Sequence, residues 1–80
     1  MNEVEILDKM NEVFKRVLGN QVGDIKKLTS PADLDQWTSL NHVLLIAETE
    51  KEFGVKFDLD DMMEFENVGD IIQGIIRKKI

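Results

Sequence analysis

The chain of 80 residues contains no cysteine and no tyrosine, and it has one histidine, one proline and one tryptophan. Without cysteine, neither a disulfide nor a thiolate metal site can stabilise the fold. One histidine and no cysteine also leave few ways to pair a nucleophile with a base, so we expect no catalytic site. Apolar runs reach only four or five residues, and a membrane span needs about 20. The acidic N-terminus lacks the basic start of a signal peptide, so a cytoplasmic location is expected.

The net charge is −6, and it is unevenly distributed along the chain. Residues 38–66 contain eight acidic and only two basic residues. Nucleic-acid binding needs clustered lysine and arginine, so no nucleic-acid partner is expected. The acidic stretch would instead attract a basic protein partner.

Hydrophobic periodicity predicts an all-α fold in a single domain, residues 1–80. The first helix is expected over residues 3–18, capped by Asn2 with Glu5 in the capping-box position and ended by Gly19. Its apolar positions recur at spacings of three and four, at Val4, Leu7, Met10, Phe14, Val17 and Leu18.

Three further helices are expected over residues 39–53, 59–65 and 68–79. Thr38 is the natural N-cap of the second helix and Gly54 its end. The fold class is therefore a bundle of three main helices plus one short helix, with a long loop between the first two. The apolar side of the last helix consists of Val68, Ile71, Ile72, Ile75 and Ile76.

Residues 19–37 form the long loop, and a loop of this length in a small domain is usually functional or packed down. A one-turn helix is expected where Ser30 precedes Pro31. The residues expected to pin the loop onto the helices are Ile25, Leu28, Leu34 and Trp37.

The second helix has two apolar sides when its residues are advanced by about 100° each. One side is an ordinary core stripe of His42, Leu45, Ile46, Thr49 and Phe53. The opposite side carries Leu40, Leu44 and Ala47, with Val43 between the two. Either the helix is buried all round or the second stripe is an exposed face for a partner. We favour the partner face, because an 80-residue bundle can hardly surround one helix.

Ser39 opens this helix, and by itself it has a structural explanation as a helix-start serine. No obvious activating base lies near it in the sequence. His42 is one turn away, but we interpret it as a packed polar residue rather than a catalytic one.

Trp37-Thr38-Ser39-Leu40, followed by an apolar helix that ends at Gly54, resembles the start of the second helix in acyl carrier proteins. That family has Asp-Ser-Leu at this point, in acidic chains of about this size. The order helix, long loop, helix, short helix, helix also matches, so the resemblance covers nearly the whole chain.

The resemblance implies that Ser39 carries a 4′-phosphopantetheine arm, which a separate phosphopantetheinyl transferase attaches from coenzyme A. The arm's thiol would hold an acyl group as a thioester and deliver it to partner enzymes of fatty-acid, polyketide or specialised biosynthesis. These enzymes would have basic or apolar docking surfaces, with no membrane partner, and the carrier would be a monomer. The expected partner-binding residues are Thr38, Leu40, Val43, Leu44, Ala47 and Glu48.

Three alternatives remain at this point. Thr38 replaces the family's aspartate, which keeps open a carrier-like scaffold that has no arm. A peptidyl carrier loaded with an amino acid is the second alternative. The third is a calcium module, for which the run of acids lacks the glycine turn and ligand spacing of an EF-hand, so no metal site is expected. The acids of this run are Asp58, Asp60, Asp61, Glu64 and Glu66.

Overall fold

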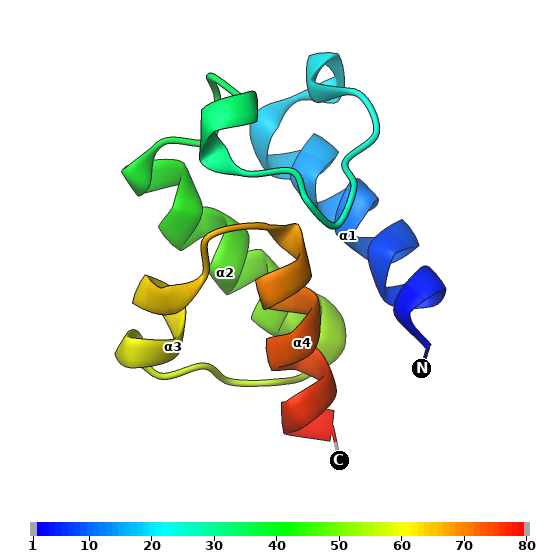
Figure 1. Ribbon diagram of the computed structural model, residues 1–80, viewed down its shortest axis with the longest axis vertical. Coiled ribbons are helices and arrows are strands. Elements are labelled where there is room, and N and C mark those ends of the chain that lie inside the picture. The colour runs from blue at the N-terminus through cyan, green and yellow to red at the C-terminus, as the bar shows by residue number, and fades with distance from the viewer. Residues whose placement is uncertain (1, 80) are drawn as a thin grey trace.

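The amphipathic segments form four α-helices in the computed structural model, which describes residues 2–79 (Figure 1). Their bounds agree with the predicted ones to within a residue, and the described part of the chain is all-helical apart from its connections. The helices are α1 (Glu3–Leu18), α2 (Ser39–Phe53), α3 (Leu59–Glu64) and α4 (Val68–Lys79). Two 3-10 turns, η1 (Asn20–Val22) and η2 (Pro31–Asp33), lie in the long loop.

Side-chain caps explain where all four helices begin. In each, an oxygen of the N-cap side chain accepts a hydrogen bond from the backbone N–H three residues later, which satisfies one of the unpaired donors of the first turn. Gly54 ends α2 in the left-handed conformation, with φ of 66°. The capping pairs are Asn2 with Glu5 (2.9 Å), Thr38 with Asn41 (3.2 Å), Asp58 with Asp61 (3.2 Å) and Asn67 with Asp70 (2.9 Å).

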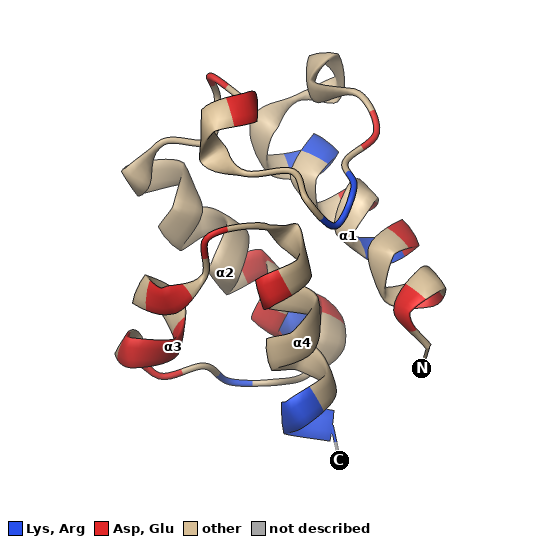
Figure 2. Ribbon diagram, in the orientation of Figure 1, with Lys and Arg blue, Asp and Glu red and all other residues tan. Residues whose placement is uncertain are grey.

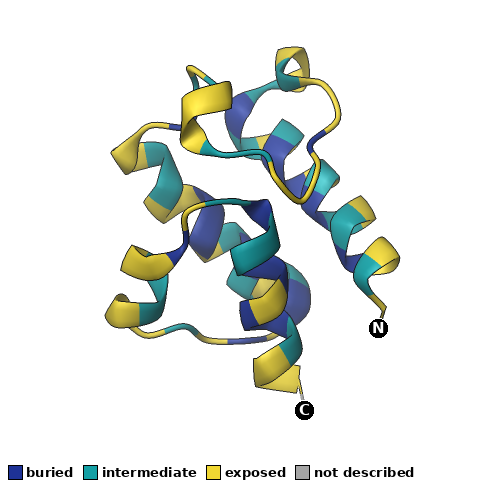
Figure 3. Ribbon diagram, in the orientation of Figure 1, coloured by how far each residue is buried: buried dark blue, intermediate teal, exposed yellow. Residues whose placement is uncertain are grey.

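The core lies between the facing sides of α1, α2 and α4, with α3 alongside (Figures 1 and 3). The predicted core stripe of α2 is confirmed, since Leu45, Ile46, Thr49 and Phe53 are buried. The prediction for Val4 is wrong, because its side chain lies 70% exposed at the first turn of α1. Ile6 is the buried residue of that turn.

The long loop is held down by hydrogen bonds as well as by apolar contacts. The side chain of Asn11 on α1 accepts from the N–H of Ile25 (2.7 Å) and donates to its carbonyl (3.5 Å). Ile25 and Trp37 are buried, as expected, but Leu28 is 84% exposed and pins nothing. Leu28 points outward because the contact at this bend is made by the backbone on either side of it.

That backbone caps the start of α4. The N–H of Val68 donates to the carbonyl of Thr29 (2.9 Å), and the N–H of Gly69 donates to the carbonyl of Lys27 (2.8 Å). The loop therefore satisfies two first-turn donors of a helix about 40 residues further along the chain.

Gly74 lies inside α4 against two aromatic rings. Phe57 and Phe65 pack edge to face with ring centroids 5.2 Å apart. A Cβ at position 74 would come within 2.9 Å of the Phe65 ring and 3.2 Å of the Phe57 ring. A glycine is therefore required here by packing, although its φ is ordinary for a helix.

Across residues 2–79, the structure contains no helix with the length and apolar character that a membrane crossing requires.

Candidate functional site

Ser39 is the first residue of α2 and is exposed to solvent. Within the described chain, its hydroxyl has no hydrogen-bond partner, and the backbone N–H groups of Ser39 and Leu40 have no acceptor. An exposed hydroxyl therefore lies beside two unpaired donors at the positive end of the helix dipole.

The backbone around Ser39 is fixed from both sides. Thr38 caps the N–H of Asn41, and the side chain of Asn41 reaches back to the carbonyl of Gln36 (2.7 Å). Trp37, just before the cap, is 3% exposed and anchors the end of the loop. Sequence reasoning missed the role of Asn41, because nothing in the sequence indicates that its amide turns back onto the loop.

The first turn of α2 contains no aspartate, glutamate, lysine or arginine. Figure 2 shows that acidic residues gather instead on α3 and its flanking segments. An anion at Ser39 would therefore meet the helix dipole without a like charge in the same turn.

The second apolar stripe of α2 is exposed, as the sequence analysis favoured. Leu40 is 72% exposed, Val43 and Leu44 are about half exposed, and Ala47 is exposed beyond them. These side chains start at Ser39 and follow one side of the helix. The predicted partner residues thus lie together, next to the candidate attachment residue.

Beside this stripe lies a shallow groove between α1 and α2, with a volume of about 430 Å³. Val17, Leu44 and Ala47 supply its apolar lining, and the remaining lining residues are Arg16, Glu48 and Lys51. This groove could not be predicted from the sequence, because the contribution of α1 depends on how the two helices pack.

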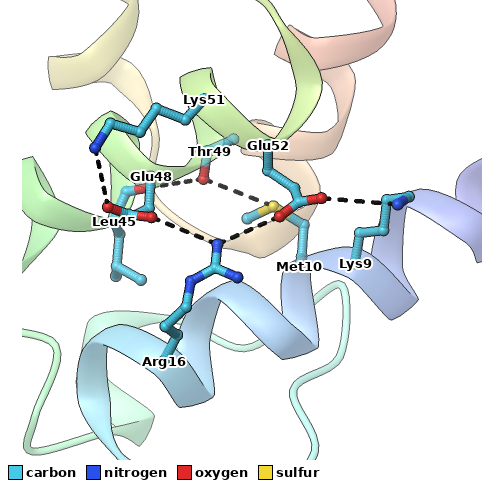
Figure 4. Close-up of polar contacts among 8 residues, drawn as sticks. All are labelled: Lys9, Met10, Arg16, Leu45, Glu48, Thr49, Lys51 and Glu52. Carbon is cyan, nitrogen blue, oxygen red and sulfur yellow. Dashed lines mark hydrogen bonds and ion pairs between the residues drawn. The ribbon is translucent and has the colours of Figure 1, made fainter.

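Glu48 is already engaged by two cations, as Figure 4 shows. Its carboxylate lies 3.4 Å from the guanidinium of Arg16 and 3.6 Å from the ammonium of Lys51. Arg16 also contacts Glu52 at 3.3 Å, which ties α1 to α2. The charge of Glu48 is therefore partly neutralised within the protein.

The acids of the run from residue 58 to 66 have structural positions of their own. Asp58 caps α3. The hydrogen bond from the backbone N–H of Asp61 is the main reason that the pKa of Asp58 lies below its ordinary value of 3.8, and a hydrogen bond with the Asp61 side chain is the next largest cause. Asp61 pairs with Lys78 at 3.7 Å. Within residues 2–79, no three acidic or histidine side chains are grouped as a metal ion would need.

Comparison with known proteins identifies this arrangement. Residues 8–75 match the family model described as the phosphopantetheine attachment site. The acyl carrier protein of Thermotoga maritima is 36% identical over 77 residues, which cover 92% of this chain and 91% of that protein. The chain belongs to the acyl carrier protein family. Membership implies a covalently attached 4′-phosphopantetheine group, and acyl carrier proteins are carriers rather than enzymes.

The fold agrees with that assignment. The solution structure of a holo acyl carrier protein from Geobacter metallireducens superposes with a TM-score of 0.84 at 31% identity, covering 92% of this chain and 85% of that one. The residues at the start of α2 also fit the group, because an exposed hydroxyl, two unpaired N–H donors and an uncharged turn suit a phosphodiester.

Proposed function

We propose that Ser39 is the attachment residue and that this acyl carrier protein delivers acyl thioesters to enzymes that dock on the exposed apolar stripe of α2. The observation that carries the proposal is the exposed Ser39 at the helix start, next to that stripe. In the transfer, the Ser39 oxygen forms a bond to the phosphorus of the phosphopantetheine half of coenzyme A. The pyrophosphate P–O bond breaks, 3′,5′-ADP leaves, and the serine proton passes to a base of the transferase.

The carrier itself supplies no base for this step, and its geometry does not call for one. His42, the only histidine, has both ring nitrogens engaged by Trp37 and Met62. The role of the carrier is to hold the hydroxyl in the open and to favour the phosphate with the dipole of α2.

Mass spectrometry tests the attachment. The protein is incubated with coenzyme A and a broad-specificity phosphopantetheinyl transferase, and the intact mass is measured. We expect a gain of one phosphopantetheine group, which disappears in Ser39→Ala. Ser30→Ala is the matched control, because Ser30 is the only other serine, and it should be modified like the wild type. No gain in the wild type would replace the proposal with the scaffold that has no arm.

We propose docking through apolar contact at Thr38, Leu40, Val43, Leu44, Ala47 and Glu48. Arg16 and Lys51 already form ion pairs with the Glu48 carboxylate, so this acid should attract a basic partner less strongly. The half-exposed Leu44 lines the groove between α1 and α2, where a partner's apolar side chain would be desolvated. A basic partner surface would contact the acids of α3 instead.

Transfer kinetics test the docking face. Leu44→Asp should raise the KM of the transferase for the carrier by about five- to tenfold. Leu44 is already half-buried in the free carrier, and burying its exposed half in the complex contributes about 1 kcal/mol. Leu28→Asp is the matched control: it makes the same chemical change at a leucine that is 84% exposed in the loop, and it should leave KM unchanged. Equal effects of the two substitutions would contradict the proposed face.

A further inference from the structure

His42 joins three segments around Ser39 through both of its ring nitrogens. The indole N–H of Trp37 donates to Nδ1 at 3.0 Å, and Nε2 lies 3.0 Å from the carbonyl oxygen of Met62 on α3. We call this contact of Trp37, His42 and Met62 the histidine clamp. It ties the end of the long loop and the middle of α3 to the first turn of α2.

The partners of His42 fix its protonation state. An indole nitrogen can only donate a hydrogen bond, and a carbonyl oxygen can only accept one. Nδ1 must therefore be the acceptor and Nε2 must carry the proton, so the clamp requires neutral imidazole in the Nε2–H tautomer. A second proton could only be added at Nδ1, where it would face the Trp37 N–H.

The clamp is packed as well as hydrogen-bonded. The Trp37 ring stacks on His42 with centroids 5.9 Å apart and an interplanar angle of 21°, and it meets the Phe14 ring of α1 edge to face at 5.0 Å. Trp37 lies two residues before Ser39 and His42 three residues after it. Any loosening of the clamp therefore acts on the backbone that presents Ser39.

We infer that neutral His42 is a positioning residue that holds the loop, α2 and α3 in place around Ser39, and that its protonation releases this hold. The effect on modification rests on the proposed attachment at Ser39; the clamp itself does not. When His42 is protonated, the two facing donors would separate, the end of the loop would loosen, and Ser39 would reach the transferase in a less fixed geometry.

No ion pair opposes this switch. On the described chain, no acidic side chain lies within 4.0 Å of the His42 ring. The charged residues nearest in sequence to the residues that meet at His42 are Lys15 on α1, Asp33 and Asp35 in the loop, Glu48 on α2, and Asp60, Asp61 and Glu64 on α3.

Nuclear magnetic resonance tests the clamp directly, because the chain has a single indole and a single imidazole. At pH 8 the nitrogen shifts of His42 should show the Nε2–H tautomer. Between pH 8 and 5 the Trp37 indole N–H resonance should move together with the His42 titration. His42→Gln is the matched variant, since an amide can accept from Trp37 and donate to Met62 without titrating, and its indole resonance should stay still. The Nδ1–H tautomer, or the same indole shift in His42→Gln, would overturn the clamp.

Modification kinetics test the positioning role. The rate of phosphopantetheine transfer to wild type is divided by the rate to His42→Gln at each pH, which cancels the transferase's own pH dependence. We expect a ratio near one at pH 8 that falls roughly three- to tenfold by pH 5.5. Transfer to His42→Ala should be slow at every pH. Both variants lack the ring, but only glutamine restores the hydrogen bonds, so faster transfer to His42→Gln would show that the hydrogen bonds position Ser39.

The resonance experiment and the kinetic experiment can fail independently of each other. A flat ratio alongside a titrating indole would overturn the positioning role while leaving the clamp. Absence of any modification of the wild type would overturn the attachment at Ser39, and the resonance measurement would still decide the clamp.

Discussion

Thr38 performs at the start of α2 the capping task that an aspartate would also perform. Its hydroxyl accepts from the N–H of Asn41 at 3.2 Å, and the extended backbone at Thr38 is that of an ordinary N-cap. The replacement therefore leaves the fold of the first turn intact. What it removes is a negative charge next to Ser39.

Removal of the cap should destabilise the protein. Thr38→Ala is expected to lower the free energy of unfolding by about 1 kcal/mol, because one first-turn donor loses its acceptor. Thr38→Asp keeps an acceptor and should stay close to wild type. Urea denaturation measures both, and equal stability of all three proteins would show that the cap contributes nothing. The modification rate of Thr38→Asp then isolates the effect of the carboxylate.

Asp58 makes part of the stability pH-dependent. Its folded pKa is lowered below 3.8 by the N–H of Asp61, with a smaller contribution from Lys78. A lowered folded pKa means that the ionised carboxylate stabilises the fold above the ordinary pKa, and that this contribution is lost as pH falls through the folded value.

Asp58→Asn tests this dependence. Asparagine retains a capping oxygen but cannot titrate. The melting temperature of the wild type should exceed that of the variant at pH 7, and the difference should shrink as the pH falls below about 4. The remaining carboxylates titrate in both proteins, so a difference that stays constant with pH would contradict this role.

At the scale of elements, periodicity and capping residues were enough to predict all four helices. The bounds follow from local signals, such as Thr38 before α2 and Gly54 after it. What could not be predicted depends on contacts between distant segments. The burial of Val4 depends on which side of the first turn of α1 faces the core. The burial of Leu28 depends on the backbone contacts of the loop.

The candidate site divides in the same way. Ser39 and the exposed stripe of α2 were predicted from the residue pattern and the family resemblance. The groove beside Leu44, the folded-back Asn41 and the histidine clamp were not, because each needs a partner supplied by α1, the loop or α3.

Gly74 shows how tertiary packing overrides helix propensity. Alanine is intrinsically better than glycine in a helix by about 1 kcal/mol. Gly74→Ala should nevertheless destabilise the protein by about 1–3 kcal/mol, because its Cβ would overpack the rings of Phe65 and Phe57. Thermal unfolding measures the change. In a Phe65→Leu background the same substitution should be less damaging, and an equal penalty there would exclude the ring contact as its cause.

For the whole molecule, charge works against compactness. The net charge is −6, and Figure 2 shows acids on α3 while lysine and arginine collect at the end of α4. The pairs that join α1 to α2 are partly exposed to solvent, which screens them and limits their contribution. We therefore expect self-repulsion among the acids to be the larger electrostatic effect.

Added salt should raise the melting temperature. Between about 0.01 M and 0.1 M monovalent salt the screening length falls from about 30 Å to about 10 Å, which weakens repulsion across the molecule. A variant with Asp60→Asn and Glu64→Gln on α3 should be less sensitive, because it starts with less repulsion. A melting temperature that is unchanged or falls with salt would show that the ion pairs outweigh the repulsion.

The loop that caps α4 also sets an order of assembly. The carbonyls of Lys27 and Thr29 find their donors only at residues 68 and 69, and Glu3 at the start of α1 bonds Gln73 across 70 residues. During synthesis, α1 and α2 can pair as soon as both have left the ribosome. The bend of the loop at residues 27–29 can find these partners only after α4 has followed, so we expect this bend to become ordered later than the parts of the loop that contact α1.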